Sequence, residues 1–123
     1  MTTILVVDDE HDILLAVDLV LSEAGYKVIT APNGKEALAR MAEVRPALVL
    51  MDIMMPVLGG LDTLKAMTAD PEYGTIPVVM MSAIIPRVSR NEYPWADFLK
   101  KPFELDSLYE VVERILKKGN GHG

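Results

Sequence analysis

The sequence predicts an α/β fold in which a doubly wound, five-stranded parallel sheet lies between two layers of helices. Short apolar runs of strand length alternate along the chain with longer segments of helical periodicity. Several of the strand-like runs are apolar without alternation, so both faces of those strands must be covered. Helices on both faces of a parallel sheet, joined to it by right-handed crossovers, meet this requirement.

Strands are expected over five short runs, 4–7, 27–31, 47–51, 76–81 and 97–99. Helices are expected over 12–23, 35–44 and 61–68, and at the C-terminal end, where apolar residues recur at helical spacing: Leu105, Leu108, Val112 and Ile115. Together with a further helix expected between the fourth and fifth strands, these segments predict five βα units. The strand order 2-1-3-4-5 is common among doubly wound sheets, and it is the order predicted here.

The size and composition of the chain indicate one acidic globular domain. Its 123 residues suffice for a single compact domain, which we expect over 1–118, followed by a flexible tail over 119–123. The net charge of −6 argues against unaided binding to nucleic acid. The absence of cysteine excludes disulfides and thiol chemistry. No signal segment or membrane-spanning run is present, so a cytoplasmic location without membrane contact is expected.

Polar residues stand where four of the apolar strands end: Asp8 and Asp9, Asp52, Ser82 and Lys101. In an open parallel sheet, ligands bind beyond the carboxyl ends of the strands, at the point where the strand order reverses. That point lies between the first and third strands. The sequence therefore predicts that carboxylates, a hydroxyl and an ammonium group converge on one small cleft.

Carboxylates that lie this close together need a positive charge to remain ionised. A hard divalent cation supplies it, and Mg²⁺ (or Mn²⁺) suits a site of carboxylate oxygens and water. A carboxylate also acts as a nucleophile toward phosphorus and forms an aspartyl phosphate. Such a transfer requires mainly positioning and neutralisation of charge. The predicted cleft therefore suits phosphoryl transfer to an aspartate.

Five segments give the chain a specific resemblance to the receiver domains of bacterial response regulators, including the chemotaxis regulators. In the order of that family they are Val6-Val7-Asp8-Asp9-Glu10, Met51-Asp52-Ile53-Met54-Met55-Pro56, Gly60, Ser82-Ala83 and Phe98-Leu99-Lys100-Lys101-Pro102-Phe103. The resemblance extends over essentially the whole chain and implies the flavodoxin-like receiver sandwich. It also implies a stand-alone, single-domain response regulator.

The resemblance assigns a role to each residue of the acidic cleft. Asp52 is similar to the phosphoacceptor of the family. Asp9 resembles the direct Mg²⁺ ligand, and Asp8 acts mainly through metal-bound water. The backbone carbonyl of Met54 is expected to complete the protein's share of the metal shell. No organic cofactor is implied.

Other residues match the catalytic and switch positions of the family. Lys101, which immediately precedes Pro102, resembles the lysine that binds a phosphoryl oxygen, and it is preferred to Lys100. The Lys101-Pro102 peptide is expected to be cis. Ser82 stands where the family has the hydroxyl that donates to the phosphoryl group, and Phe98 stands at the aromatic switch position.

The function implied is that of a two-component or phosphorelay receiver, not of an enzyme with a substrate of its own. It takes a phosphoryl group on Asp52 from a histidine kinase or histidine phosphotransfer protein, and it signals to a downstream protein. The chain is alternatively a fragment of a larger regulator or hybrid kinase, or a receiver that binds a partner without being phosphorylated. A haloacid-dehalogenase-type phosphatase needs a second aspartate where Met54 stands. An FMN domain needs a phosphate loop where Asp8 and Asp9 stand.

Two features depart from the family pattern. Gly59 takes the position where the family usually has an aspartate cap, which predicts a looser loop after Asp52. The interval between Ser82 and Lys101 is shorter than usual and contains Pro86 and Pro94, which leave room for at most about two helical turns. We therefore expect a fourth helix that is short, distorted or mobile.

Several conspicuous residues receive no role in phosphoryl transfer. Glu10 is interpreted as a charge at the start of a helix rather than as a ligand. Trp95 is expected to be half-exposed. The methionines are interpreted as packing in the core or at the rim of the cleft, and no role is assigned to His11 or His122.

Overall fold

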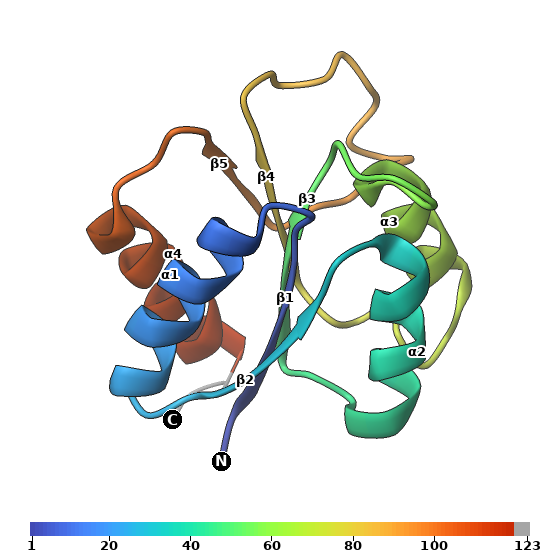
Figure 1. Ribbon diagram of the computed structural model, residues 1–123. Coiled ribbons are helices and arrows are strands. Elements are labelled where there is room, and N and C mark those ends of the chain that lie inside the picture. Colours follow the sequence, from blue (N-terminus) through green and yellow to red (C-terminus); the bar gives the residue numbers. More distant parts are fainter. Residues whose placement is uncertain (120–123) are drawn as a thin grey trace.

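The computed structural model describes residues 1–119, and residues 120–123 of the expected tail lie outside the described part (Figure 1). Its strands are β1 (Thr3–Val7), β2 (Lys27–Ala31), β3 (Leu48–Asp52), β4 (Val78–Ser82) and β5 (Asp97–Lys100). Its helices are α1 (His11–Glu23), α2 (Gly34–Val44), α3 (Gly60–Ala69) and α4 (Leu105–Gly119). The bounds of the strands and of α1, α2 and α3 lie within two residues of the expected ones, and α4 contains the four apolar residues that predict it.

The five strands form one parallel sheet in the order β2-β1-β3-β4-β5, which confirms the predicted order. β1 and β3 are neighbours in register from Ile4 opposite Leu48 to Val7 opposite Met51. The residues that follow β1 and those that end β3 therefore meet at one edge of the sheet. Every residue of β3 and β4 is buried, in agreement with strands that are covered on both faces.

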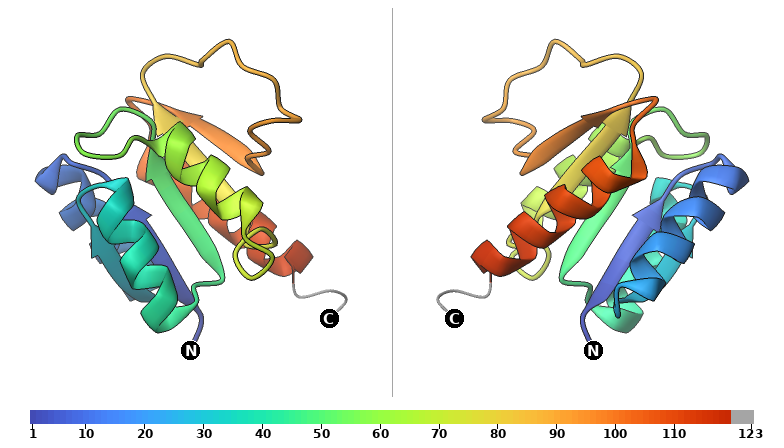
Figure 2. Two further views of the ribbon diagram at one scale, coloured as in Figure 1. Left: turned by 90° about the vertical axis from the view of Figure 1, so that its right-hand side faces the viewer. Right: turned by 90° about the vertical axis from the view of Figure 1, so that its left-hand side faces the viewer.

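Two helical layers cover the sheet (Figure 1, Figure 2). α2 and α3 pack on one face, where the buried core includes Met41, Met67 and Met80. α1 and α4 pack on the other face, where it includes Leu21 and Leu108. Adjacent strand residues point to opposite cores, so the register of the sheet fixes which side chains reach each helix layer. Among the described residues, no helix is both long and apolar enough to cross a membrane.

The expectation of a helix between β4 and β5 was wrong. Residues 83–96 form a loop of bends and turns, which rises above the sheet in Figure 1, and the described residues hold four helices rather than five. Pro86 and Pro94 remove two backbone donors from this short interval and exclude a continuous helix. The loop is nevertheless tied down, because Ala96 N donates to Val78 O at 2.7 Å.

Trp95 is buried, and the expectation that it would be half-exposed was also wrong. Only 5% of its surface is accessible, and it belongs to the core on the α2–α3 face of the sheet. Its ring lies 5.7 Å from the ring of Phe98, and the Arg90 guanidinium lies 4.7 Å from its centre. Arg90 also donates a hydrogen bond to Trp95 O. The indole thus packs on the sheet where the short interval provides no helix.

Val57, in the loop after β3, has a backbone conformation that β-branched residues rarely adopt. Its φ is +68°, and Leu58 N donates to Pro56 O at 2.7 Å, which closes a γ-turn around Val57. Strain of this kind costs about 1–3 kcal/mol. The Val57 side chain is 74% exposed, so its removal sacrifices little packing.

Val57→Gly is therefore expected to raise the free energy of unfolding by about 1 kcal/mol, after the larger chain entropy of glycine is subtracted. Urea denaturation of the two proteins measures this difference. Val57→Ala is the matched control, because alanine is also strained at positive φ, and it should gain less. A glycine variant no more stable than the alanine variant would show that the turn stores no relevant strain.

Candidate functional site

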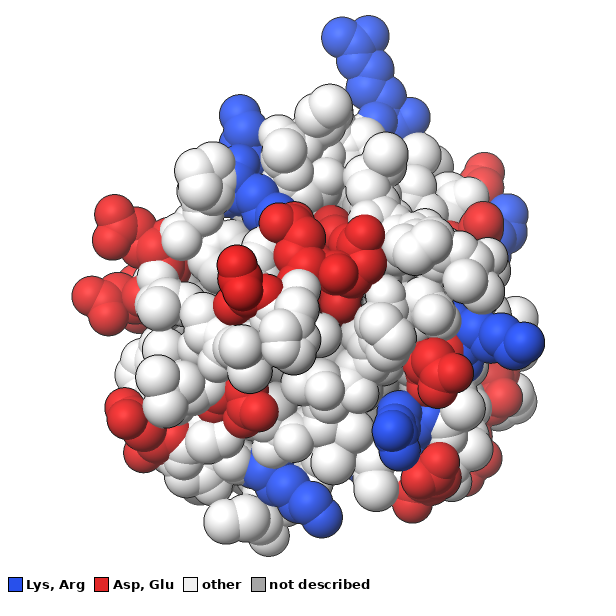
Figure 3. Space-filling view, in the orientation of Figure 1, with Lys and Arg blue, Asp and Glu red and all other residues white. Residues whose placement is uncertain are grey.

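The polar residues at the strand ends lie together at the carboxyl edge of the sheet, as the sequence predicts. Asp8 follows β1, Asp52 ends β3, Ser82 ends β4 and Lys101 follows β5. The side chains of Asp8, Asp52 and Ser82 are buried. In the space-filling view, acidic side chains gather near the ends of β1 and β3 (Figure 3). Beside them is a cavity of about 490 Å³, whose lining includes Asp9, Asp52, Ser82 and Lys101.

The Lys101 ammonium group is the positive centre of the site. Its Nζ lies 2.8 Å from Asp8 Oδ2, 3.1 Å from Glu10 Oε1 and 3.4 Å from Asp52 Oδ2. The Lys101-Pro102 peptide is cis, as expected, and Lys101 N donates to Ser82 O at 2.8 Å. Pairing between β4 and β5 thus continues to Lys101, so its side chain starts next to the end of β4.

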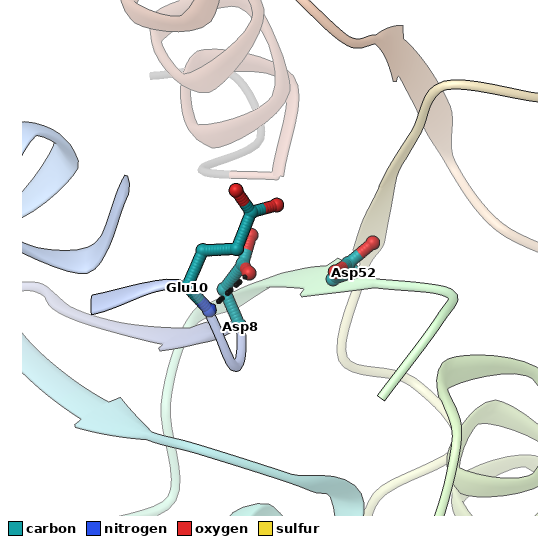
Figure 4. A group of neighbouring side chains, drawn as sticks. All are labelled: Asp8, Glu10 and Asp52. Atoms are coloured by element: carbon teal, nitrogen blue, oxygen red, sulfur yellow. Dashed lines mark hydrogen bonds between the residues drawn. The ribbon is translucent and has the colours of Figure 1, made fainter. Parts of the chain in front are cut away.

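The carboxylates of Asp8, Glu10 and Asp52 each offer an oxygen, and these oxygens lie within 4.8 Å of one another (Figure 4). Asp8 accepts twice, from Glu10 N at 2.9 Å and from Lys101 Nζ. Asp9 is exposed and lines the cavity with Asp52, but it is not part of this close group. Lys101 already lies among the carboxylates of this close group, whereas Asp9, Asp52 and Met54 line the cavity beside it, where carboxylate and carbonyl oxygens fit Mg²⁺.

Asp52 lies where its negative charge is disfavoured. Burial, together with the charge of Asp8, raises the pKa of Asp52 from 3.8 to about 6. The charge and hydrogen bond of Lys101, and a bond from Met54 N to Asp52 Oδ1 at 3.4 Å, act in the opposite direction but do not cancel the rise. A further positive charge at this carboxylate would therefore be stabilising.

Lys101 remains a cation despite its burial. Desolvation acts to lower its pKa, but hydrogen bonds to Asp8 and Glu10 and the charges of Asp8 and Asp52 outweigh it, so the pKa of Lys101 lies above its usual value. A permanently charged ammonium group at this position can bind an anionic oxygen of a group attached to Asp52.

Gly60 holds the loop after β3 close to the end of that strand. Gly60 N donates to Ile53 O at 2.9 Å, and a Cβ on Gly60 would lie 2.2 Å from Asp52 O. Any side chain here would collide with the backbone that holds Asp52. Gly59 is the N-cap residue of α3 and has no side chain to cap the helix, and the looser loop that this implies stays a prediction.

Ser82 and Phe98 connect the site to the loop of residues 83–96. Ser82 Oγ accepts from Ile84 N at 3.3 Å. Phe98 is partly buried against the core and contacts Trp95, as described above. Two contacts here could not be read from the sequence: that of Glu10 with Lys101, and that of Arg90 with Trp95. An acidic residue directly after the Asp8-Asp9 pair was the one available signal for the first.

Comparison with known proteins places the chain among receiver domains. The family model described as the response regulator receiver domain matches residues 4–113. Protein PilH of Pseudomonas aeruginosa is 30% identical over 122 residues, which cover 94% of this chain and 98% of PilH. The transcriptional regulatory protein PrrA of Mycobacterium leprae is 37% identical over 118 residues, which cover 94% of this chain and 50% of PrrA. The chain thus spans about half the length of PrrA.

Solved structures agree with this assignment. Chemotaxis protein CheY4 of Vibrio cholerae superimposes with a TM-score of 0.86 at 31% identity, with coverage of 94% of this chain and 98% of CheY4. The receiver domain of a signal transduction histidine kinase from Syntrophus aciditrophicus gives a TM-score of 0.90 at 28% identity, with coverage of 100% and 95%. Family match, sheet order and the acidic edge of the sheet concur: the chain belongs to the receiver domains of two-component response regulators.

Proposed function

We propose that Asp52 accepts a phosphoryl group from a histidine kinase or a histidine phosphotransfer protein, in a reaction that requires Mg²⁺. The observation that carries this proposal is the buried Asp52 carboxylate, which ends the central strand 3.4 Å from the Lys101 ammonium and opens on a cavity. A nucleophilic carboxylate and a fixed cation at one cavity match the needs of phosphoryl transfer.

In the transfer step, an oxygen of Asp52 forms a bond to phosphorus while the bond from phosphorus to the donor breaks, and the leaving group departs with that electron pair. Lys101 binds one oxygen of the arriving group, and the Ser82 hydroxyl donates to another. Asp8, Asp9, Asp52 and the carbonyl of Met54 would hold the metal. Mg²⁺, when bound, neutralises charge on the carboxylates and the phosphoryl oxygens.

Signalling would follow from a shift between two conformations of the domain. A phosphoryl oxygen that accepts from the Ser82 hydroxyl would draw Oγ toward Asp52 and away from Ile84 N, which donates to Ser82 Oγ at 3.3 Å. Phe98 lies on the neighbouring strand, against Trp95. A movement at Ser82 can therefore be transmitted through the 83–96 loop to Phe98, and a downstream protein that binds one state better shifts the equilibrium.

The test of this function is incubation of the protein with acetyl phosphate, with MgCl₂ or with EDTA, followed by intact-protein mass spectrometry. Wild type should gain one phosphoryl group with MgCl₂ and none with EDTA. Lys101→Ala should load at least about tenfold more slowly, because it loses a charge-assisted contact with the phosphoryl group. Lys100→Ala removes the exposed lysine at the preceding position, and as the matched control it should load like wild type. Loading of wild type in EDTA at an undiminished rate would contradict the proposal.

The phosphorylated state is expected to be long-lived. Hydrolysis needs a water in line with the bond between Asp52 and phosphorus, and Met54 and Ile84 line the cavity where such a water would enter. Neither side chain can hydrogen-bond and orient a water molecule. Met54→Asn supplies an amide there and should speed dephosphorylation, and about 1.4 kcal/mol of such help gives a tenfold increase.

The rate of phosphoryl loss after removal of the donor measures this effect. Met54→Leu is the control, since leucine is similar in size and also apolar. An asparagine variant that dephosphorylates no faster than the leucine variant would rule out orientation of water at this position.

Relatives of the chain carry this domain in different settings. PrrA, of which the chain spans about half, is a transcriptional regulatory protein, whereas PilH is matched over nearly its whole length. The receiver domain of the Syntrophus aciditrophicus histidine kinase gives a third setting. The domain is therefore proposed to be one part of a longer regulator or hybrid kinase, or a single-domain regulator whose output is a protein contact.

A further inference from the structure

Glu10 makes a contact that its position does not explain. It is the N-cap residue of α1, but its side chain forms no capping hydrogen bond. The carboxylate turns instead toward the strand ends and accepts from Lys101 Nζ at 3.1 Å (Figure 4 shows it beside Asp8). Carboxylates are favourable at a helix N-terminus, where free backbone N–H groups can donate to them. The Glu10 side chain does not use these donors and binds Lys101 instead.

Lys101 is surrounded by acceptors. Its ammonium group has three N–H bonds, and three carboxylates lie within 3.4 Å of Nζ, those of Asp8, Glu10 and Asp52. A phosphoryl group on Asp52 needs one of these donors. Asp8 is fully buried and Asp52 is nearly so, and both are fixed at strand ends. The Glu10 side chain is 59% exposed, so it is the partner that can leave for water at the lowest cost.

We propose that Glu10 is a positioning residue that holds Lys101 before phosphorylation and yields it to the entering phosphoryl group. This inference rests on the proposed function of Asp52. While it is bound, Glu10 occupies one of the three Lys101 donors, and its charge competes with a phosphoryl oxygen for the ammonium group. Its charge also adds to the negative field that a phosphoryl donor, itself an anion, must cross. Glu10 therefore slows loading of the domain by anionic donors.

A role for Glu10 as a simple anchor of Lys101 predicts the opposite change in the loading rate. If Glu10 served only to anchor Lys101 in its working position, its removal would loosen Lys101 and slow loading. Asp8, however, holds Lys101 at 2.8 Å from a buried position, and it remains after Glu10 is replaced. The structure thus supplies a second anchor, and the loss of Glu10 frees a donor without releasing the lysine.

The experiment compares Glu10→Gln with wild type at saturating Mg²⁺ and low ionic strength, with acetyl phosphate as donor. Glutamine keeps the length of the side chain and removes its charge. We expect loading to be about three- to tenfold faster, and the difference to shrink as salt is added. Asp12→Asn is the matched control: it removes one exposed charge from the first turn of the same helix, and Asp12 is not among the described partners of Lys101.

An equilibrium readout separates this effect from the rate of chemistry. Beryllofluoride, an anionic phosphoryl analogue, should bind Glu10→Gln more tightly than wild type by a similar factor. Equal or slower loading of Glu10→Gln would overturn the inference, and so would an equal acceleration in Asp12→Asn. If wild type itself does not load, the proposed function fails, which is a different result from a loaded wild type whose rate Glu10→Gln leaves unchanged.

Discussion

Trp95→Ala is expected to lower the free energy of unfolding by about 3–5 kcal/mol, as for other large aromatic side chains removed from a packed core. Trp95 is buried on the α2–α3 face of the sheet, where it contacts Phe98 and lies beneath Arg90. Residues 83–96 form no helix, so no helix packs here to fill the space that alanine would leave. Urea denaturation followed by circular dichroism measures the loss, because the variant lacks the single tryptophan of the chain.

Arg90→Ala is the control for this substitution. It removes the cation above the ring and the bond to Trp95 O but leaves the indole in the core, so it should cost only about 1–2 kcal/mol. If Trp95→Ala were no more destabilising than Arg90→Ala, the tryptophan would not be the residue that ties this loop to the core.

Asp52→Asn is expected to stabilise the metal-free protein at pH 7, by on the order of 1–3 kcal/mol. The fold raises the pKa of Asp52 from 3.8 to about 6, chiefly by burial and by the charge of Asp8. Its charged form is thus less favourable in the folded protein than in the unfolded chain. Asparagine retains the shape of the side chain and removes this charge.

The pH dependence of the difference follows from the sign of this shift. The folded protein binds the Asp52 proton more tightly than the unfolded chain does. The destabilisation therefore begins near pH 3.8 and is complete above about pH 6. Denaturation of wild type and Asp52→Asn in EDTA should show a stability gap that widens between pH 4 and 6 and is then constant. A gap of constant size, or a less stable variant, would refute the raised pKa.

The positions of the site residues were predictable because the parallel sheet fixes them. Asp8, Asp52 and Ser82 each end an apolar run, and parallel strands bring their carboxyl ends to the same edge. The direction of a strand is sufficient for this inference. The short apolar runs predict only that helices cover both faces, and the order 2-1-3-4-5 was predicted because it is common among such doubly wound sheets.

The contacts that the sequence did not predict depend on tertiary packing. Pro86 and Pro94 indicated a disturbed helix, but whether Trp95 then turns inward depends on the space left over Phe98. Glu10 was interpreted as a charge at a helix start, which is correct for its backbone. Its side chain reaches Lys101, 91 residues away in the chain, and no local pattern encodes that contact.

The most direct test of phosphoryl transfer to Asp52 is chemical trapping of the phosphorylated protein. Borohydride reduces an aspartyl phosphate to homoserine, and peptide mass spectrometry locates the change. After incubation with acetyl phosphate and Mg²⁺, we predict homoserine at position 52 in wild type and at no position in Asp52→Asn. Homoserine at position 8 or 9, or undiminished phosphorylation of Asp52→Asn, would contradict the assignment of Asp52 as the phosphoacceptor.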